Sequence, residues 1–528
     1  MNQPSVGSTQ HGNALMALAA LLVLGGILLT LSSFGFTKVR VDRDRATNEA
    51  LARAKDALIA YAVSDLGRPG ELPCPDVNDD GKIILGEDMV GSACTSLIGR
   101  LPWVTLGLPD LRDDAGERLW YALSNDFHAN GTVPLNSDTA YRAANVSLSI
   151  IGAAPAANLV AVVFSAGATL RRADGVQQAR GCTVGTDCDA TFKCTTAPAT
   201  VTAKCNPMNY LDLDSGEDNA NLANRIFVSA TRSEAFNDRL MPVFSDDIMH
   251  LVERRAARQL VQHLRDHFNA WQNSIIVAGA NKGFYPFAVP WNDPSSTPAQ
   301  FGTDGTMSGL LPLTTAAPVW SNVSAVCSGN GTTTLQCNTL VVCILGICVP
   351  GSVSGQVDNI ATRFVDPPTA ANFTLLGLNL GGGPSWTLNK AQRRLEFTYS
   401  GIVAAGVLNI QVSAPPISSW VGGWLGSNNW QQNAYYAFAP GFAIDGADVC
   451  GPPCFTVNNT GAVSNDNHAV VAMTGRSLSA AGQSPRPVAP VPANFNEFLE
   501  GANAAAGTVF ERNARVATFN DTPVGVKP

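Results

Sequence analysis

The chain has 528 residues, a formal net charge of −8 and a charged fraction of only 14%. Its 48 glycines and 32 prolines indicate a turn-rich β protein, and the length suffices for about two to four domains. Basic residues gather only just after residue 37 and at 253–258, with acids interleaved, as on solvated helix faces. This pattern argues against nucleic acid as a partner.

An apolar run of 22 residues without a charged side chain lies near the start of the chain, from Leu15 to Phe36. At roughly 1.5 Å of rise per residue, a helix of this length crosses the hydrocarbon core of a bilayer. The sequence therefore predicts a membrane-spanning helix at residues 15–36.

The following stretch, 38–61, contains no Gly or Pro and places Leu51, Ala54, Leu58 and Tyr61 three or four positions apart. This spacing predicts an amphipathic continuation, so that one helix covers residues 13–66. An ordinary signal peptide has a shorter apolar core followed by a small-residue cleavage site, which this stretch lacks. We therefore expect a single-pass inner-membrane protein.

A long helix that is apolar in its first half and amphipathic in its second resembles the spine of type IV pilins. His11 and Gly12, placed before the apolar run, resemble a prepilin peptidase site, while Ala17 stands where most major pilins carry a glutamate. The resemblance implies that residues 1–12 are a leader, that prepilin peptidase cuts after Gly12, and that Asn13 becomes a methylated N-terminus. The alternative is a plain single-pass anchor.

Twelve cysteines are grouped locally along the chain, as is typical of disulfides in an exported protein. Structural zinc is the alternative, but zinc favours tight C-x₂-C pairs and most spacings here are wider. The predicted body therefore lies in the periplasm or outside the cell, with local closures at Cys74 with Cys94 and Cys450 with Cys454. The remaining disulfide candidates are Cys182, Cys188, Cys194, Cys205, Cys327, Cys337, Cys343 and Cys348.

The chain presents the same order of motifs twice: a helix, a Pro-rich turn, a Trp/Tyr strand, an apolar strand, an acidic loop with Asn, and Phe-Asn-Asp. This order predicts two tandem units, at 67–242 and 243–528, the second opening with a helix at 245–272. Residues 327–416 have no counterpart in the first unit. Their strand-like runs predict a β insertion, the place where a binding surface is expected.

Four motifs of the first unit resemble those of large bacterial pilin-like proteins: Pro69–Asp76, Gly99–Leu108, Leu119–Ala122 and Phe236–Arg239. The resemblance implies a minor pilin or pseudopilin of a type IV pilus or type II secretion-like apparatus. It further implies other pilin or pseudopilin subunits as partners and no characterised catalytic activity.

The loop at 76–87 has the spacing of a calcium loop. Asp76, Asn78 and Asp80 stand at positions 1, 3 and 5, Gly81 at position 6, and Glu87 at position 12. Prolines before the loop exclude the entering helix of an EF-hand, and a polar turn between strands is the alternative. Calcium is thus the one cofactor that the sequence suggests, and pseudopilins often carry it. A second, less regular acidic loop lies at 212–218.

No catalytic motif is present. His263 and His267 are one helical turn apart, but no Glu follows the first as a metalloprotease requires, so we interpret both as part of a solvated helix face. Nucleophile elbows, phosphate loops and dinucleotide fingerprints are missing from the sequence. Trp103, Trp120 and Trp430 are interpreted as core aromatics rather than a carbohydrate-binding face. The sequence therefore predicts no enzyme.

Together these patterns predict an α+β fold with a long N-terminal transmembrane and amphipathic helix, followed by two tandem pilin-like antiparallel β-rich units with disulfides. The predicted function is structural, with the globular part displayed at or near the tip of a filament. A surface adhesin on a membrane anchor is the first alternative. A membrane-tethered hydrolase is the second.

Overall fold

The computed structural model describes residues 10–527 except 129–133, 142–145, 183, 186–187, 191–193, 195–205, 222, 224, 292–301, 313–318, 322–326, 330–333, 341–342, 345–346, 349–350, 370, 376–377, 380–382, 402–406, 414–422, 451–453, 460–461 and 484–494. Its contacts divide the chain into two compact units. Unit 1 comprises Met1–Tyr61, Leu72–His128 and Ser147–Phe244. Unit 2 comprises Ala62–Glu71, Ala129–Val146 and Ser245–Pro528.

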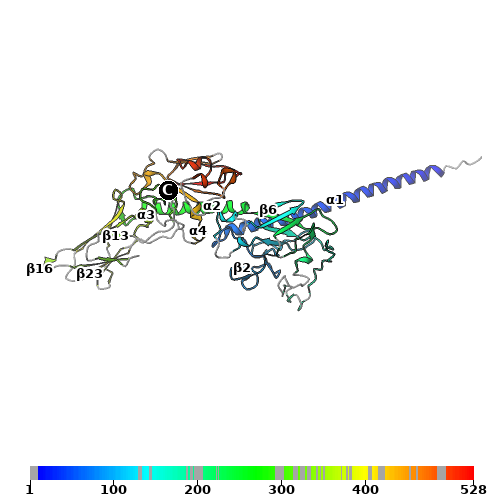
Figure 1. Cartoon of the computed structure of the whole chain (residues 1–528), viewed down its shortest axis with the longest axis horizontal. Helices are drawn as coiled ribbons and strands as arrows, with labels where there is room; N and C mark the ends of the chain where they lie inside the picture. The colour runs from blue at the N-terminus through cyan, green and yellow to red at the C-terminus, as the bar shows by residue number, and fades with distance from the viewer. Residues whose placement is uncertain are drawn as a thin grey trace, which may run out of the picture. The chain divides into compact units, whose positions relative to one another are not determined.

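Helix α1 (Gln10–Ser64) lies along the sheet of unit 1 and continues beyond it, as the blue helix of Figure 1 shows. Ala50, Leu51, Ala54 and Leu58 are buried, because their spacing of three and four residues places them on one face of the helix. The Nζ atom of Lys55 donates a hydrogen bond to the carbonyl oxygen of Pro242. The second half of α1 is therefore part of the core of unit 1.

Unit 1 is built on one six-stranded sheet in the order β3-β4-β6-β5-β9, with β10 also pairing with β6. Its strands are β3 (Ile98–Arg100), β4 (Trp120–Leu123), β5 (Leu148–Gly152), β6 (Ala156–Ser165), β9 (Ile226–Ser229) and β10 (Arg239–Phe244). The smaller elements are β1 (Met89–Val90), β2 (Ala93–Cys94), η1 (Asn125–Phe127), η3 (Pro207–Asn209), β7 (Leu213–Asp214) and β8 (Glu217–Asp218).

Every residue of β4 is buried, so both faces of this sheet are covered. Trp120, Phe164, Tyr210 and Phe227 belong to the apolar cluster on one face, and Trp120 contacts Tyr210 with a ring-centroid distance of 5.2 Å. A strand covered on both faces needs apolar residues at successive positions, which explains the continuous run in β6.

Unit 2 repeats this arrangement with different residues. Its main sheet has the order β12-β24-β27-β29, and a second sheet has the order β26-β25-β28. These strands are β12 (Ser308–Leu310), β24 (Ala434–Phe438), β25 (Phe455–Asn459), β26 (Ala462–Asn467), β27 (Ala469–Met473), β28 (Val509–Arg512) and β29 (Thr522–Val526). Helix α2 (Ser245–Gln272) packs on β27 and β29. The short helices are η2 (Thr139–Tyr141), α4 (Trp424–Ser427), η4 (Trp430–Asn433), η5 (Pro440–Phe442), η6 (Ser479–Ala481), η7 (Phe495–Glu497) and η8 (Gly501–Ala505).

The order β3-β4-β6-β10 of unit 1 corresponds strand by strand to β12-β24-β27-β29 of unit 2. The hydroxyl of Tyr121 donates to the Pro73 carbonyl in unit 1, and that of Tyr436 donates to the Pro286 carbonyl in unit 2. Even the parallel pairing of β5 with β9 returns as the parallel pairing of β25 with β28. The internal repeat of the sequence is therefore a repeat of structure.

The insertion in unit 2 contributes two further five-stranded sheets. The first has the order β11-β21-β22-β18-β13 and uses β11 (Val277–Ala278), β13 (Val319–Ser321), β18 (Gly351–Asp358), β21 (Ser385–Asn389) and β22 (Arg394–Gly401). The second, in the order β14-β15-β23-β19-β20, uses β14 (Cys327–Gly329), β15 (Thr334–Leu340), β19 (Ala371–Leu375), β20 (Leu378–Asn379) and β23 (Val407–Ser413). The hairpin of β16 (Cys343–Ile344) with β17 (Ile347–Cys348) and the helix α3 (Ile360–Arg363) complete it. Its first sheet thus recruits strands from outside the predicted range of 327–416.

The predicted fold class is wrong in two respects. Crossing a bilayer takes about 20 consecutive apolar helical residues, and across the described parts of the chain no helix is both long and apolar enough to do so. The predicted transmembrane span at 15–36 and the single-pass inner-membrane location are therefore overturned. The prediction of two antiparallel β-rich units also needs correction. The strands are spread over several separate sheets, and β9 and β28 pair in parallel with β5 and β25 after long connections.

Each unit contains a close approach between a glycine and an asparagine of that same unit. A Cβ atom on Gly475 would lie 2.3 Å from the side-chain carbon of Asn520, and one on Gly167 would lie 2.8 Å from that of Asn237. Asn520 cannot move aside easily, because its amide donates to the Arg476 carbonyl at 2.8 Å and the residue is buried. The position beside this asparagine thus has room only for glycine.

We expect Gly475→Ala to lower the free energy of unfolding by about 1 to 3 kcal/mol, because the added methyl group overpacks a pinned side chain. Chemical denaturation of the purified chain measures the loss. Gly507→Ala is the matched control, since a Cβ atom there meets nothing within 4 Å. Equal stability of the two variants would contradict the close-approach argument, and Asn520→Ala should relieve part of the loss in the double variant.

Candidate functional site

A pair of buried carboxylates joins three distant segments of unit 1. One oxygen of Asp238 accepts hydrogen bonds from the backbone N–H of Asp212 at 2.8 Å and from the amide of Asn219 at 2.9 Å. In return, one oxygen of Asp212 accepts from the backbone N–H groups of Asn237 and Asp238 at 2.6 and 3.2 Å. Gln178 donates to the other oxygen of Asp212 at 2.9 Å. The carboxylates thus satisfy backbone donors that the sheet leaves unpaired.

Unit 2 contains the same arrangement, with a glutamate in place of one aspartate. Asp521 accepts from the backbone N–H of Glu500 at 2.8 Å and from the amide of Asn503 at 3.0 Å. Glu500 accepts from the N–H groups of Asn520 and Asp521 at 2.9 and 3.1 Å, and from Gln483 at 2.8 Å. We call these two arrangements the acid pairs: Asp212–Asp238 in unit 1 and Glu500–Asp521 in unit 2.

Burial changes the acidity of these groups. Desolvation, followed by the negative charge of Asp212, raises the pKa of Asp238 well above its ordinary value. In unit 2, desolvation and the charge of Glu500 raise the pKa of Asp521 in the same way. Two adjacent buried carboxylates cannot both ionise cheaply, so each pair retains a proton at a pH where an exposed acid would have lost it.

The predicted calcium loop forms a compact turn organised by its first residue. Asp76 is buried and accepts hydrogen bonds from the backbone N–H groups of Asn78, Asp79 and Gly81 at 2.9, 2.8 and 2.6 Å. Desolvation is the main cause that raises the pKa of Asp76 to about 7, and the nearby charges of Asp79 and Asp88 act in the same direction. Gly81 has φ +80°, which only glycine adopts without strain.

The remaining predicted ligands are placed around this turn. The Asn78 amide donates to a Glu87 oxygen at 2.7 Å, while the Asn78 side-chain oxygen accepts from the N–H of Asp80. The neighbouring Asp88, fully buried, accepts from Val77 and Ile84 at 2.9 Å each and was missed by the sequence analysis. The structure therefore brings the predicted residues into one loop, and calcium binding by them stays a prediction.

The second acidic loop does not gather its carboxylates around one point. Asp212 belongs to the acid pair of unit 1, whereas Asp214 and Glu217 are paired residues of the β7–β8 hairpin. Asp218 lies 2.8 Å from the guanidinium of Arg172. The acids of this loop therefore take part in three separate contacts: the acid pair, the hairpin and the ion pair with Arg172.

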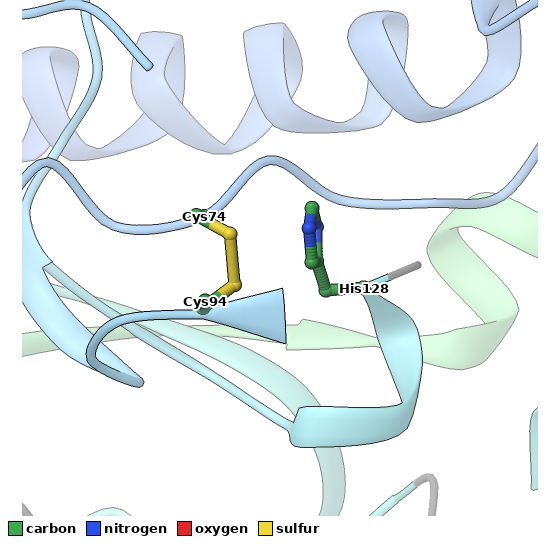
Figure 2. Close-up of side chains that lie close together, drawn as sticks. All are labelled: Cys74, Cys94 and His128. Atoms are coloured by element: carbon green, nitrogen blue, oxygen red, sulfur yellow. A yellow bond between two sulfur atoms is a disulfide. The ribbon is translucent and has the colours of Figure 1, made fainter. Parts of the chain in front are cut away.

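A disulfide and a histidine lie side by side in unit 1, as Figure 2 shows for Cys74, Cys94 and His128. Their potential ligand atoms all lie within 4.8 Å of one another, and this is the one such metal-type group within the described residues. The Nδ1 atom of His128 is 2.9 Å from the carbonyl oxygen of Leu72. Thiolates rather than disulfide sulfurs bind metals, so the bonded pair is a crosslink that closes the acidic loop.

Disulfides are confirmed at the two predicted closures, Cys74–Cys94 and Cys450–Cys454, and Cys182 is bonded to Cys188. Cys194 is also disulfide-bonded. In the insertion, the backbone register places Cys327 opposite Cys337 and Cys343 opposite Cys348. Cys205 lies outside the described residues.

The interpretation of His263 and His267 as a solvated face is wrong for His267. This side chain is buried and stacks on Phe364 with a centroid distance of 4.3 Å. Burial lowers its pKa, and Asp366 lies 3.9 Å from its Nδ1 atom. An apolar stripe from Val252 through Leu260 to Phe268 places His267 on the inner side of α2, which could have revealed its burial.

Four apolar side chains near the start of α1 are exposed. Leu18, Leu21, Leu22 and Val23 are between 62% and 71% exposed. The predicted processing residues Gly12 and Asn13 lie in the first turn of the helix, which begins at Gln10. Because helix ends fray, this position stays compatible with a protease substrate.

No known protein family, curated protein or solved structure matches this chain.

The acid pair of unit 2 predicts a pH dependence. Since the folded state keeps the proton of Asp521 to a higher pH than the unfolded chain does, stability is lost as the pH rises above the ordinary value of 3.8. Asp521→Asn is neutral and can keep the bonds from Glu500 and Asn503 on its side-chain oxygen. Relative to the wild type, we expect the variant to gain about 1 to 3 kcal/mol of stability between pH 5 and pH 8.

Urea denaturation at the two pH values measures this difference. Asp466→Asn is the control, because Asp466 is exposed and Lys527 lowers its pKa, so that removal of its charge brings no gain at high pH. If the free energy of unfolding changed with pH in the same way in the wild type and in Asp521→Asn, the acid pair would not share a proton.

Proposed function

We propose that this protein is a structural subunit, of the minor pilin or pseudopilin kind, in a type IV pilus or type II secretion-like filament. In this proposal α1 is the element through which it assembles, and its partners are the helices of like subunits. The single observation that carries the proposal is that the second half of α1 docks on the sheet of unit 1, whereas four apolar side chains near its start, Leu18, Leu21, Leu22 and Val23, are exposed.

The exposed leucines offer a packing stripe. Leu21 and Leu22 lie three and four positions after Leu18 and thus share its side of the helix, and all three are exposed. Burying a leucine side chain is worth about 1.5 to 3 kcal/mol, so a few such contacts from several neighbours suffice to hold a subunit. A neighbouring α1 presents the same stripe and therefore fits it.

The docked half supplies the rigid attachment that a filament subunit needs. Arg239 pairs with Asp44, and Thr47 shares hydrogen bonds of 3.1 and 3.0 Å with the side chain and backbone of Asp114. With the buried face that starts at Ala50, these contacts fix the helix to the sheet over several turns. Force applied at the exposed leucines would then be transmitted along the helix to the body rather than to a hinge.

Processing tests the class of protein. We expect the chain made in cells with prepilin peptidase to begin at Asn13, and the chain made without it to keep residues 1–12. Mass spectrometry of the intact protein measures both. An unprocessed chain in cells that contain an active peptidase would remove the pilin-like proposal.

Assembly tests the role of the stripe. We expect Leu21→Asn with Leu22→Asn to reduce incorporation into sheared filaments by more than about tenfold, because each change removes more than 1.4 kcal/mol of packing. Ile275→Asn is the matched control, since Ile275 is 98% exposed and lies outside α1. Normal incorporation of the double variant, with circular dichroism showing intact folding, would exclude α1 as the assembly element.

A further inference from the structure

Three arginines form a cluster on unit 2 that the proposed assembly through α1 does not use. Arg254 and Arg258 are exposed on the outer side of α2, and Arg512 is the last residue of β28 and half-buried. Residues four positions apart on a helix have their Cβ atoms about 5 to 6 Å apart, so Arg254 and Arg258 are neighbours. We call the three the arginine cluster.

The chain after β28 brings Arg512 to this helix. Three residues further on, Arg515 forms an ion pair with the buried Glu253, which precedes Arg254 on α2. On the other side, the backbone N–H of Glu511 donates to Asn503 at 2.7 Å, which fixes the end of the strand. Arg512 is therefore held between two anchored residues, close to α2.

Within the described part of the chain, none of the three guanidinium groups has a hydrogen bond, an ion pair or an aromatic partner. No acidic residue stands three or four positions before or after either helical arginine. Besides each other, Arg254 has His250, Leu251 and Ala257 at these positions, and Arg258 has Arg255, Val261 and Gln262. Nearby Arg515, by contrast, forms an ion pair with Glu253. The cluster is thus unpaired in a chain that carries a net charge of −8.

Such an arrangement costs the fold stability. Burial and then the charges of Arg254 and Arg258 lower the pKa of the Arg512 guanidinium, although no arginine loses its proton in this range. Like charges four positions apart on a helix repel each other and destabilise it. A ligand that brings negative charge would remove the repulsion.

We propose that the arginine cluster is a binding site for phosphate groups. A guanidinium group offers a planar fork of N–H donors that matches the oxygens of phosphate. A phosphate dianion also offsets the charge of three guanidinium groups better than a singly charged carboxylate does. Two sources share this chemistry: inorganic phosphate as a free ion, and the phosphate groups along a polyanionic chain. The cluster lies on α2 and β28 and not on α1, so a failed phosphate-binding test would leave the assembly proposal untouched.

Calorimetric titration of the purified full chain with inorganic phosphate tests the site, against chloride at equal ionic strength. We expect Arg512→Gln to weaken phosphate binding by about tenfold or more, since it removes charge-assisted hydrogen bonds. The same variant should melt at a higher temperature than the wild type without phosphate, because the repulsion is gone, and should lose the stabilisation that phosphate gives.

Arg53→Gln is the matched control, because Arg53 is an exposed helical arginine with Glu49 and Asp56 within one turn. It should bind phosphate as the wild type does. Equal stabilisation by chloride, or unchanged phosphate binding in both Arg512→Gln and the double variant Arg254→Gln with Arg258→Gln, would overturn the proposal. Tighter binding of linear polyphosphate than of inorganic phosphate at equal phosphate concentration identifies a polymer as the source, and equal binding identifies the free ion.

Discussion

The structure of each unit depends on a buried carboxylate that accepts backbone hydrogen bonds. Asp238 and Asp521 stand at the start of the last strand of their sheets, where each takes an N–H group from a loop far away in sequence. Such N–H groups would be costly if they stayed buried without an acceptor. The acid pairs thus close the sheet, and their retained protons are the consequence of placing two carboxylates together out of water.

This closure explains why the units tolerate large differences elsewhere. Once the last strand is fixed beside β6 or β27, the connections between strands no longer determine the topology. Unit 2 accordingly carries two additional sheets, whereas unit 1 carries a cysteine-rich stretch near Cys188. Loop length costs little free energy once the ends are held, since the closure entropy grows only with its logarithm.

Sequence patterns predicted the local and repetitive features well. The spacing of cysteines identified Cys74–Cys94 and Cys450–Cys454, and the Phe-Asn-Asp motifs marked the two acid pairs as equivalent positions without revealing their burial. Long-range pairing could not be predicted, because nothing near β9 or β28 encodes a parallel partner. His267 shows the same limit: its class as a polar residue suggested exposure, while its neighbours in space bury it.

The repeat also separates what the fold requires from what it does not. Asp76 and Val289 occupy equivalent positions, since each exchanges two backbone hydrogen bonds with the partner strand, at Arg100 and at Leu310. The sheet therefore needs the backbone at this position and not the carboxylate. By the same register, Arg512 corresponds to Ser229. The Asp76 carboxylate instead organises its own loop through the three backbone N–H groups that it accepts. Arg512 has no such return within the described residues, because its guanidinium lies near the like charges of Arg254 and Arg258 and the sister unit has a serine in its place.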